Sequence, residues 1–164
     1  MANWSEAFAT QAGSDLDALL VLESRGLPIC HRLHYLQMWL EKLYKAHLWM
    51  PDASSEEMRF KHNVIARVLP SLISRHRHRL GVGENRDLTA IRELCREIDM
   101  LPPQADDHGR KPENVEYPWV GSSGAVEVSA QWKRSLAGRL YTNPGRQLLK
   151  AASILTRNAV VFLR

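Results

Sequence analysis

The chain has few of the features by which secreted and membrane proteins are recognised. Among its 164 residues only Cys30 and Cys95 are cysteines, which is too few for a disulfide framework, so reduced thiols are expected. No apolar run is long enough to span a bilayer. The first residues have neither the basic start nor the apolar core of a signal peptide. These absences predict a cytoplasmic protein that does not engage a membrane.

Familiar catalytic and metal-binding motifs are missing as well. The sequence contains no glycine-rich phosphate loop, no G-x-S-x-G elbow and no H-E-x-x-H pair. Cys30 and His34 are four residues apart and would share a helical face. A zinc site, however, needs at least three protein ligands, and no second cluster has a matching spacing. The sequence therefore predicts neither a metal site nor a cofactor.

Acidic residues are absent from the whole segment 131–164. The segment instead carries seven basic residues, which are Lys133, Arg134, Arg139, Arg146, Lys150, Arg157 and Arg164. Arg146, Lys150 and Arg157 fall within about one face of the expected last helix, opposite its apolar stripe. Two interpretations are equally supported: a polyanion or acidic protein partner, or pairing with acidic residues elsewhere in the chain. Pairing alone is a weak explanation for a segment with charges of only one sign, because surface ion pairs add little stability. The acidic candidates for pairing are Glu56, Glu57, Glu93 and Glu97.

What the chain does contain is a set of clear signals for where helices end. Gly26 with Pro28, Gly81, and Pro102-Pro103 each follow an apolar segment with helical spacing. The patterns predict one domain, 1–164, that folds as an all-α antiparallel bundle of five to six helices, with a polar loop at 104–129 before the C-terminal helices. The expected elements include a third helix opened by Ser54 and kinked at Pro70, a short helix at 131–140, and a last helix capped by Asn143 that continues to Phe162.

The segment 30–49 is the most informative of the expected helices. Its leucines recur every three or four residues and predict a buried face. His34, Gln37, Glu41 and Lys45 line another face, with Glu41 four residues ahead of Lys45 in the favourable ion-pair order.

A basic run closes the expected third helix. Arg75, Arg77 and Arg79 alternate with His76 and His78. Cations at a helix C-terminus complement its dipole, which is the simpler explanation. The same five residues would also form a phosphate-attracting patch, although no aromatic residue interleaves them for base stacking.

The first two expected helices resemble the opening of HEPN domains, which are small prokaryotic helical bundles. The resemblance rests on D-L-D-A-L-L from Asp15 and on E-K-L-Y-K-A-H from Glu41 to His47, with His62 and the E-Y-P-W run at 116–119 as further matches. It implies a four- or five-helix bundle, often dimeric. Many HEPN proteins are metal-independent ribonucleases of toxin–antitoxin or antiviral defence systems, and others accompany nucleotidyltransferases or bind nucleotides.

The ribonuclease members of that family carry an R-x(4–6)-H motif near the last core helix. In this chain no arginine of the C-terminal segment has a histidine at that distance. The only match is Arg25 with His31, at the entrance to the second helix. A ribonuclease would use His31 as the acid/base and Arg25 as the phosphate clamp.

The leading expectation is therefore a HEPN-like protein that acts by binding and lacks nuclease activity. Its partner would be RNA, a nucleotide or a cognate protein such as a nucleotidyltransferase or defence protein, and a homodimer is expected. The contacts would come from Arg146, Lys150 and Arg157, with Lys42, Lys45 and the basic run as further candidates. The alternatives are the ribonuclease toxin and a structural assembly subunit. For a protein interface the candidates are Tyr117, Trp119 and Trp132.

Overall fold

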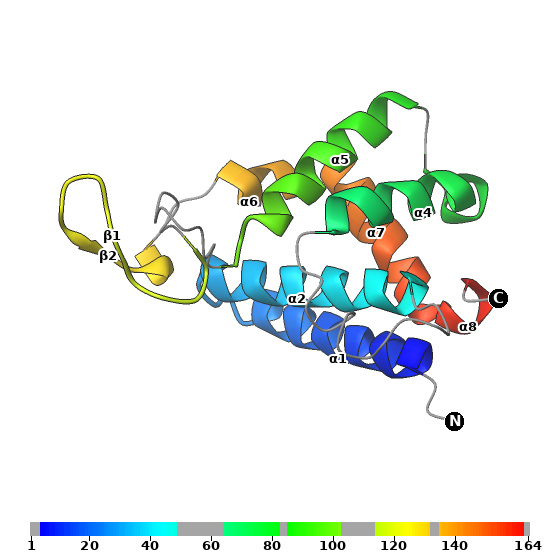
Figure 1. Ribbon diagram of the computed structural model, residues 1–164, viewed down its shortest axis with the longest axis horizontal. Coiled ribbons are helices and arrows are strands. Elements are labelled where there is room, and N and C mark those ends of the chain that lie inside the picture. The colour runs from blue at the N-terminus through cyan, green and yellow to red at the C-terminus, as the bar shows by residue number, and fades with distance from the viewer. Residues whose placement is uncertain (1–3, 49–63, 83–84, 103–113, 132–134, 163–164) are drawn as a thin grey trace.

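The structure, a computed structural model, describes residues 4–48, 64–82, 85–102, 114–131 and 135–162 (Figure 1). It confirms the predicted all-α bundle. The α-helices are α1 (Trp4–Ser24), α2 (Ile29–Leu48), α4 (Ile65–Leu80), α5 (Asn85–Asp99), α6 (Ser135–Leu140), α7 (Asn143–Arg157) and α8 (Ala159–Phe162). None of the helices in these ranges is long and apolar enough to cross a bilayer.

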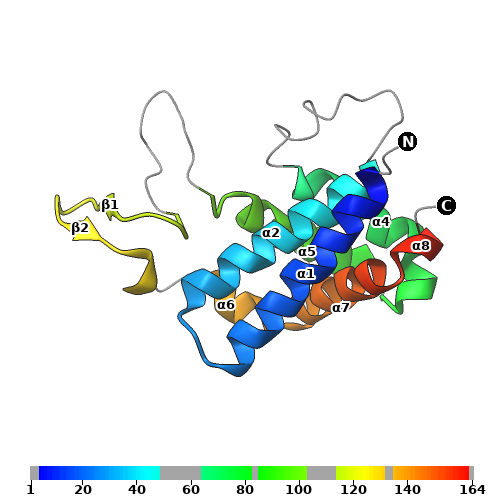
Figure 2. The same ribbon diagram turned by 90° about the horizontal axis from the view of Figure 1, so that it is seen from below.

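Helix α2 is the centre of the bundle. It packs along α1, and its other sides meet α4, α5 and α7 (Figures 1 and 2). The predicted leucine face is buried: Leu36, Leu40 and Leu43 are at most 2% exposed. Trp39 and Tyr44 are buried beside them. Burial of large apolar side chains on several sides of one helix supplies most of the free energy that holds the bundle together.

Lys42 and Lys45 of α2, which were further candidates for contacts with a partner, are instead engaged in ion pairs. The Lys42 ammonium pairs with Asp15 of α1 at 2.8 Å. The Lys45 ammonium pairs with Glu41 at 2.6 Å, and Lys45 is only 4% exposed. The Gln37 amide donates to the second oxygen of Glu41 at 2.7 Å. Since lysine and glutamate are rarely buried unless paired, these pairs explain how α2 carries charges between its neighbours.

Two predicted glycine caps are confirmed. Gly26 has φ +63° and lies in the connection from α1 to α2. Gly81 has φ +60° and ends α4, with its backbone N–H donating to the Arg77 carbonyl. Only glycine adopts this left-handed conformation without a penalty, so both helices end where the sequence indicates.

Helix α4 begins later than predicted. Val64 has non-helical backbone angles and precedes the first helical residue, Ile65, so an unbroken helix from Ser54 is wrong; residues 49–63 lie outside the described ranges. Backbone N–H groups at the start of α4 donate to the buried carboxylate of Asp99, from Ile65 at 3.1 Å and from Ala66 at 2.9 Å. An acid at the end of α5 thus caps the preceding helix. Pro70 lies inside α4, as predicted.

The last helix differs from the prediction at two points, and the short helix predicted at 131–140 is α6, which begins at Ser135. Thr142, rather than Asn143, holds the N-cap position of α7. The predicted last helix is also divided, because Asn158 interrupts it between α7 and α8. The Asn158 side chain donates to the Ile154 carbonyl at 3.0 Å. Asparagine competes for backbone groups in this way and commonly ends helices.

The polar loop before α6 contains a small hairpin that stands away from the bundle (Figures 1 and 2). Strand β1 (Trp119–Val120) pairs antiparallel with β2 (Val126–Glu127), and the 3-10 turn η1 (Ser129–Gln131) follows. We name residues 114–131 the arm. Its base is tied to the bundle by the Val115 N–H, which donates to the Leu101 carbonyl at 3.1 Å.

Candidate functional site

The structure brings the two basic segments of the sequence together. The Lys150 ammonium on α7 lies against Gly81, the residue that ends α4; a Cβ placed on that glycine would be 3.4 Å from it. Helices α4 and α7 also contact each other. The predicted phosphate-binding residues on these helices are all exposed, namely Arg75, Arg77, Arg79, Arg146, Lys150 and Arg157.

Neither of these two segments contains an acidic residue, in 64–82 or in 135–162. We give the name basic face to the exposed cations near this contact, which are Arg77 and Arg79 of α4 and Arg146 and Lys150 of α7. One Arg146 guanidinium nitrogen donates to the Tyr141 carbonyl at 2.9 Å, and its remaining N–H donors make no other hydrogen bond to a described residue. Local positive charge of this kind attracts phosphate.

Arg139 behaves differently from the residues of the basic face. Its guanidinium pairs with two glutamates of α5, Glu93 at 3.6 Å and Glu97 more closely. For Arg139, pairing with acidic residues elsewhere in the chain is therefore confirmed. The same residue provides a natural control for any test of the basic face.

His76 of the α4 basic run lies close enough to His47 of α2 to disfavour the charged form of His47. His47, at the end of α2, has one buried ring nitrogen, Nε2, without a hydrogen-bond partner among the described residues. Burial, followed by the nearby His76 and Arg75, lowers the pKa of His47 to about 4. Burial and the arginines beside it also lower the pKa of His76, whose ring packs edge-on against Phe162. Both imidazoles are neutral at physiological pH, so they add no charge to the basic face.

The candidate nuclease pair lies at the connection between α1 and α2. Arg25 and His31 are both exposed, on either side of the Gly26 turn. The His31 backbone N–H donates to the Pro28 carbonyl at 3.2 Å and so belongs to the first turn of α2. Neither side chain lines the cavity described below.

The thiols and the remaining histidines do not form a metal centre in the described ranges, where no group of three histidine, cysteine or acidic side chains is close enough to hold an ion. Cys30 and Cys95 are buried and unbridged. Burial raises the pKa of the Cys95 thiol, which makes it a poor nucleophile. The Nδ1 atom of His34 lies 3.4 Å from a carboxylate oxygen of Glu116 on the arm.

The residues predicted for a protein interface fall into different environments. Tyr117 is 60% exposed on the arm, together with Val120 and Val126. Trp119 is only 6% exposed and packs within its own chain, so little of its side chain is left for a partner. Trp132 lies outside the described residues.

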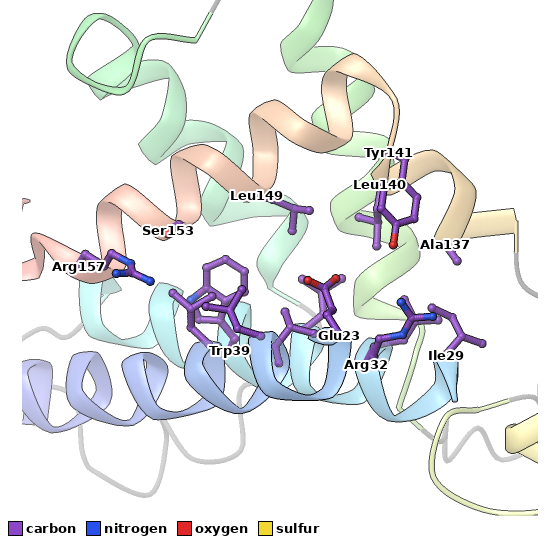
Figure 3. Close-up of a pocket in the computed structure, with 15 residues that line it drawn as sticks. Glu23, Ile29, Arg32, Trp39, Ala137, Leu140, Tyr141, Leu149, Ser153 and Arg157 are labelled. Carbon is purple, nitrogen blue, oxygen red and sulfur yellow. The ribbon is translucent and has the colours of Figure 1, made fainter. Parts of the chain in front are cut away.

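An apolar cavity of about 180 Å³ lies between α1, α2, α6 and α7 (Figure 3). Leucines of α1 and α2 and the indole of Trp39 form its walls, and Leu149 of α7 faces them. Polar side chains are few and come from four helices or their ends. They are Glu23, Arg32, Tyr141, Ser153 and Arg157.

Sequence reasoning missed most of this cavity. Arg157 was found from its charge, but Arg32 and Tyr141 were not. A signal for Arg32 was present, because it follows Ile29 by three residues and precedes Leu36 by four, which places it on the border of the apolar face of α2. The cavity itself depends on how four helices pack, and no spacing within one helix reveals it.

Comparison of the chain with models of protein families, with curated proteins and with solved structures gives no match.

Proposed function

We propose that this protein is a HEPN-like helical bundle that acts by binding RNA on the basic face, without cleaving it. The observation that carries the proposal is the position of Lys150 against Gly81. This contact places an exposed cation of α7 at the end of the basic run of α4, and neither segment contains an acidic residue. Phosphate contacts of this type supply most of the free energy of non-specific nucleic-acid binding.

The charged residues of the HEPN-like motif have a structural role in this proposal. One ion pair joins Lys42 of α2 to Asp15 of α1. A second joins Lys45 to Glu41 within α2. Lys42 and Lys45 are therefore poor candidates for phosphate contacts, which corrects the expectation from sequence. The motif would hold the α1–α2 pair together while other helices carry the binding surface.

The proposal is tested by measuring the affinity for a fluorescently labelled single-stranded RNA as salt is raised. Each phosphate contact that is lost should reduce the slope of log affinity against log salt by about 0.7. The variants Arg146→Gln and Lys150→Gln should each weaken binding and flatten this slope. The control is Arg139→Gln, since Arg139 is already paired with Glu93 and Glu97. Equal slopes in all three variants, or no binding to RNA, would contradict the proposal.

A second candidate function, a contact with another protein, is favoured by the arm. Val120 and Val126 are 60% and 71% exposed on a hairpin that stands away from the bundle (Figure 1). Exposed apolar residues in a group commonly mark interfaces. We propose the arm as the contact in a homodimer or with a nucleotidyltransferase or defence-type partner. The double variant V120S/V126S should then lower the mass measured by light scattering after size exclusion; a mass equal to one chain in the unmodified protein would contradict the homodimer.

A further inference from the structure

The cavity between α1, α2, α6 and α7 is shaped for an apolar group. Its volume, about 180 Å³, is somewhat larger than the engineered cavity of about 150 Å³ that takes up benzene. The walls include Leu16, Leu19, Leu33, Leu36 and Leu149, with Trp39 beside them (Figure 3). Leu20 and Tyr141 also line it and are 44% and 62% exposed, so the cavity opens to solvent on that side.

The polar groups around the cavity have an excess of positive charge. Arg32 and Arg157 carry one positive charge each and Glu23 carries one negative charge, which leaves a net charge of +1. Figure 3 shows Arg157 near Trp39, while Glu23, Arg32 and Tyr141 lie toward the other end of the cavity. Among the described residues no carboxylate is recorded in an ion pair with either arginine.

Arg32 has a buried hydrogen-bond donor that a ligand could satisfy. Its Nε atom is buried and has no hydrogen-bond partner among the described residues. Leaving a buried donor unpaired is unfavourable, and a carboxylate is the acceptor that a guanidinium binds best, since two parallel hydrogen bonds form. Arg32 also lies on the same face of α2 as Leu36 and Ile29, which line the cavity.

We propose that this cavity binds a small amphipathic monocarboxylate, with its carboxylate on Arg32 and an apolar chain of about six to ten carbons against the leucines. A single negative charge matches the net charge of +1 around the cavity. A phosphate monoester, with nearly two negative charges at neutral pH, matches it less well. The site shares no residue with the basic face, so failure of RNA binding would leave it unaffected.

The test is calorimetric titration of the full chain with hexanoate, octanoate, 1-octanol and octylamine. Octanoate should bind, and affinity should rise about fourfold per methylene from hexanoate. Octanol and octylamine should bind at least tenfold more weakly than octanoate. Equal binding of octanol, or tighter binding of octylamine, would overturn the proposal, as would the absence of octanoate binding.

Two variants and a control locate the ligand. Arg32→Gln should weaken octanoate binding by roughly tenfold or more, because a hydrogen bond to a charged group is lost, while octanol binding should not change. Leu149→Phe should reduce the binding of both ligands by filling the cavity. Arg92 is exposed on α5 and does not line the cavity, so Arg92→Gln should bind octanoate normally. An equal loss in Arg92→Gln and Arg32→Gln would show general attraction by charge and overturn the assignment of Arg32, even if Leu149→Phe fails to fold.

Discussion

The indole Nε1–H of Trp39 donates a hydrogen bond of 2.8 Å to the hydroxyl of Thr156, which is 117 residues away in the chain. Thr156 in turn donates to the Ala152 carbonyl one turn earlier in α7. The contact is buried and fastens the central helix to the last long one. It also fixes the orientation of an indole that forms part of the cavity wall.

Replacement of Thr156 by valine should destabilise the protein by about 1–3 kcal/mol, because the Trp39 N–H would be left buried without a partner. Trp39→Phe removes the donor but also leaves a gap, so it should destabilise too. The double variant should be more stable than the sum of the two single effects predicts. Urea unfolding of the four proteins measures this coupling, and strict additivity would show that the hydrogen bond contributes nothing.

Two glycines near the start of α7 should respond oppositely to alanine. A Cβ on Gly145 would collide with the carbonyl oxygens of Arg139 and Leu140, whereas one on Gly138 meets nothing within 4 Å. Gly145→Ala should therefore destabilise the fold by about 1–3 kcal/mol through overpacking. Gly138→Ala, within α6, should stabilise it by about 0.5–1 kcal/mol through helix propensity. Thermal unfolding distinguishes the two, and similar shifts would contradict the close approach of α6 and α7.

His47 should make stability fall in mild acid. Its pKa is about 4 in the folded protein against 6.5 for the free side chain. Between these values the unfolded chain binds a proton that the folded chain does not, so stability drops as pH falls from about 6.5 to about 4 and is unaffected above that window. The drop is at most about 3 kcal/mol, and less for a half-buried ring. Denaturant midpoints of the protein and of His47→Gln should diverge only in this window; parallel curves would refute the assignment.

The chain should not cleave RNA through Arg25 and His31. Both side chains are exposed, and transition-state charge is stabilised effectively only by groups held in a water-excluded site. Expression should therefore cause no growth arrest, and purified protein should leave RNA intact. Cleavage that disappears in His31→Ala but persists in the control variant His78→Ala, also at an exposed histidine, would instead support the ribonuclease alternative.

The features predicted correctly from sequence were those set within single helices. Apolar spacing located the buried face of α2. Gly26 and Gly81 marked the ends of their helices, because the left-handed backbone conformation found there favours glycine. The exposed cations of α7 were likewise visible from their spacing opposite its apolar stripe. Each of these depends on residues a few positions apart, which a sequence displays directly.

The features missed depend on residues far apart in the chain. Lys42 and Lys45 were expected among the residues that contact a partner. The partner that buries Lys42 is Asp15, on another helix. The start of α4 was misplaced for the same reason, since its capping acid, Asp99, follows it by more than thirty residues. The cavity needs four helices to meet, and the spacing within α2 places Arg32 only at the border of its apolar face.

The cap that Asp99 places on α4 has a consequence for the order in which the chain is assembled. The Asp99 carboxylate accepts hydrogen bonds from the backbone N–H groups of Ile65 and Ala66, which precede it by 34 and 33 residues. During synthesis α4 therefore leaves the ribosome before its own cap exists, and its first turn gains that stabilisation only when α5 has been made and has folded back. The two helices are thus expected to become stable as one cooperative unit, with α1 and α2 already available as the surface on which they settle.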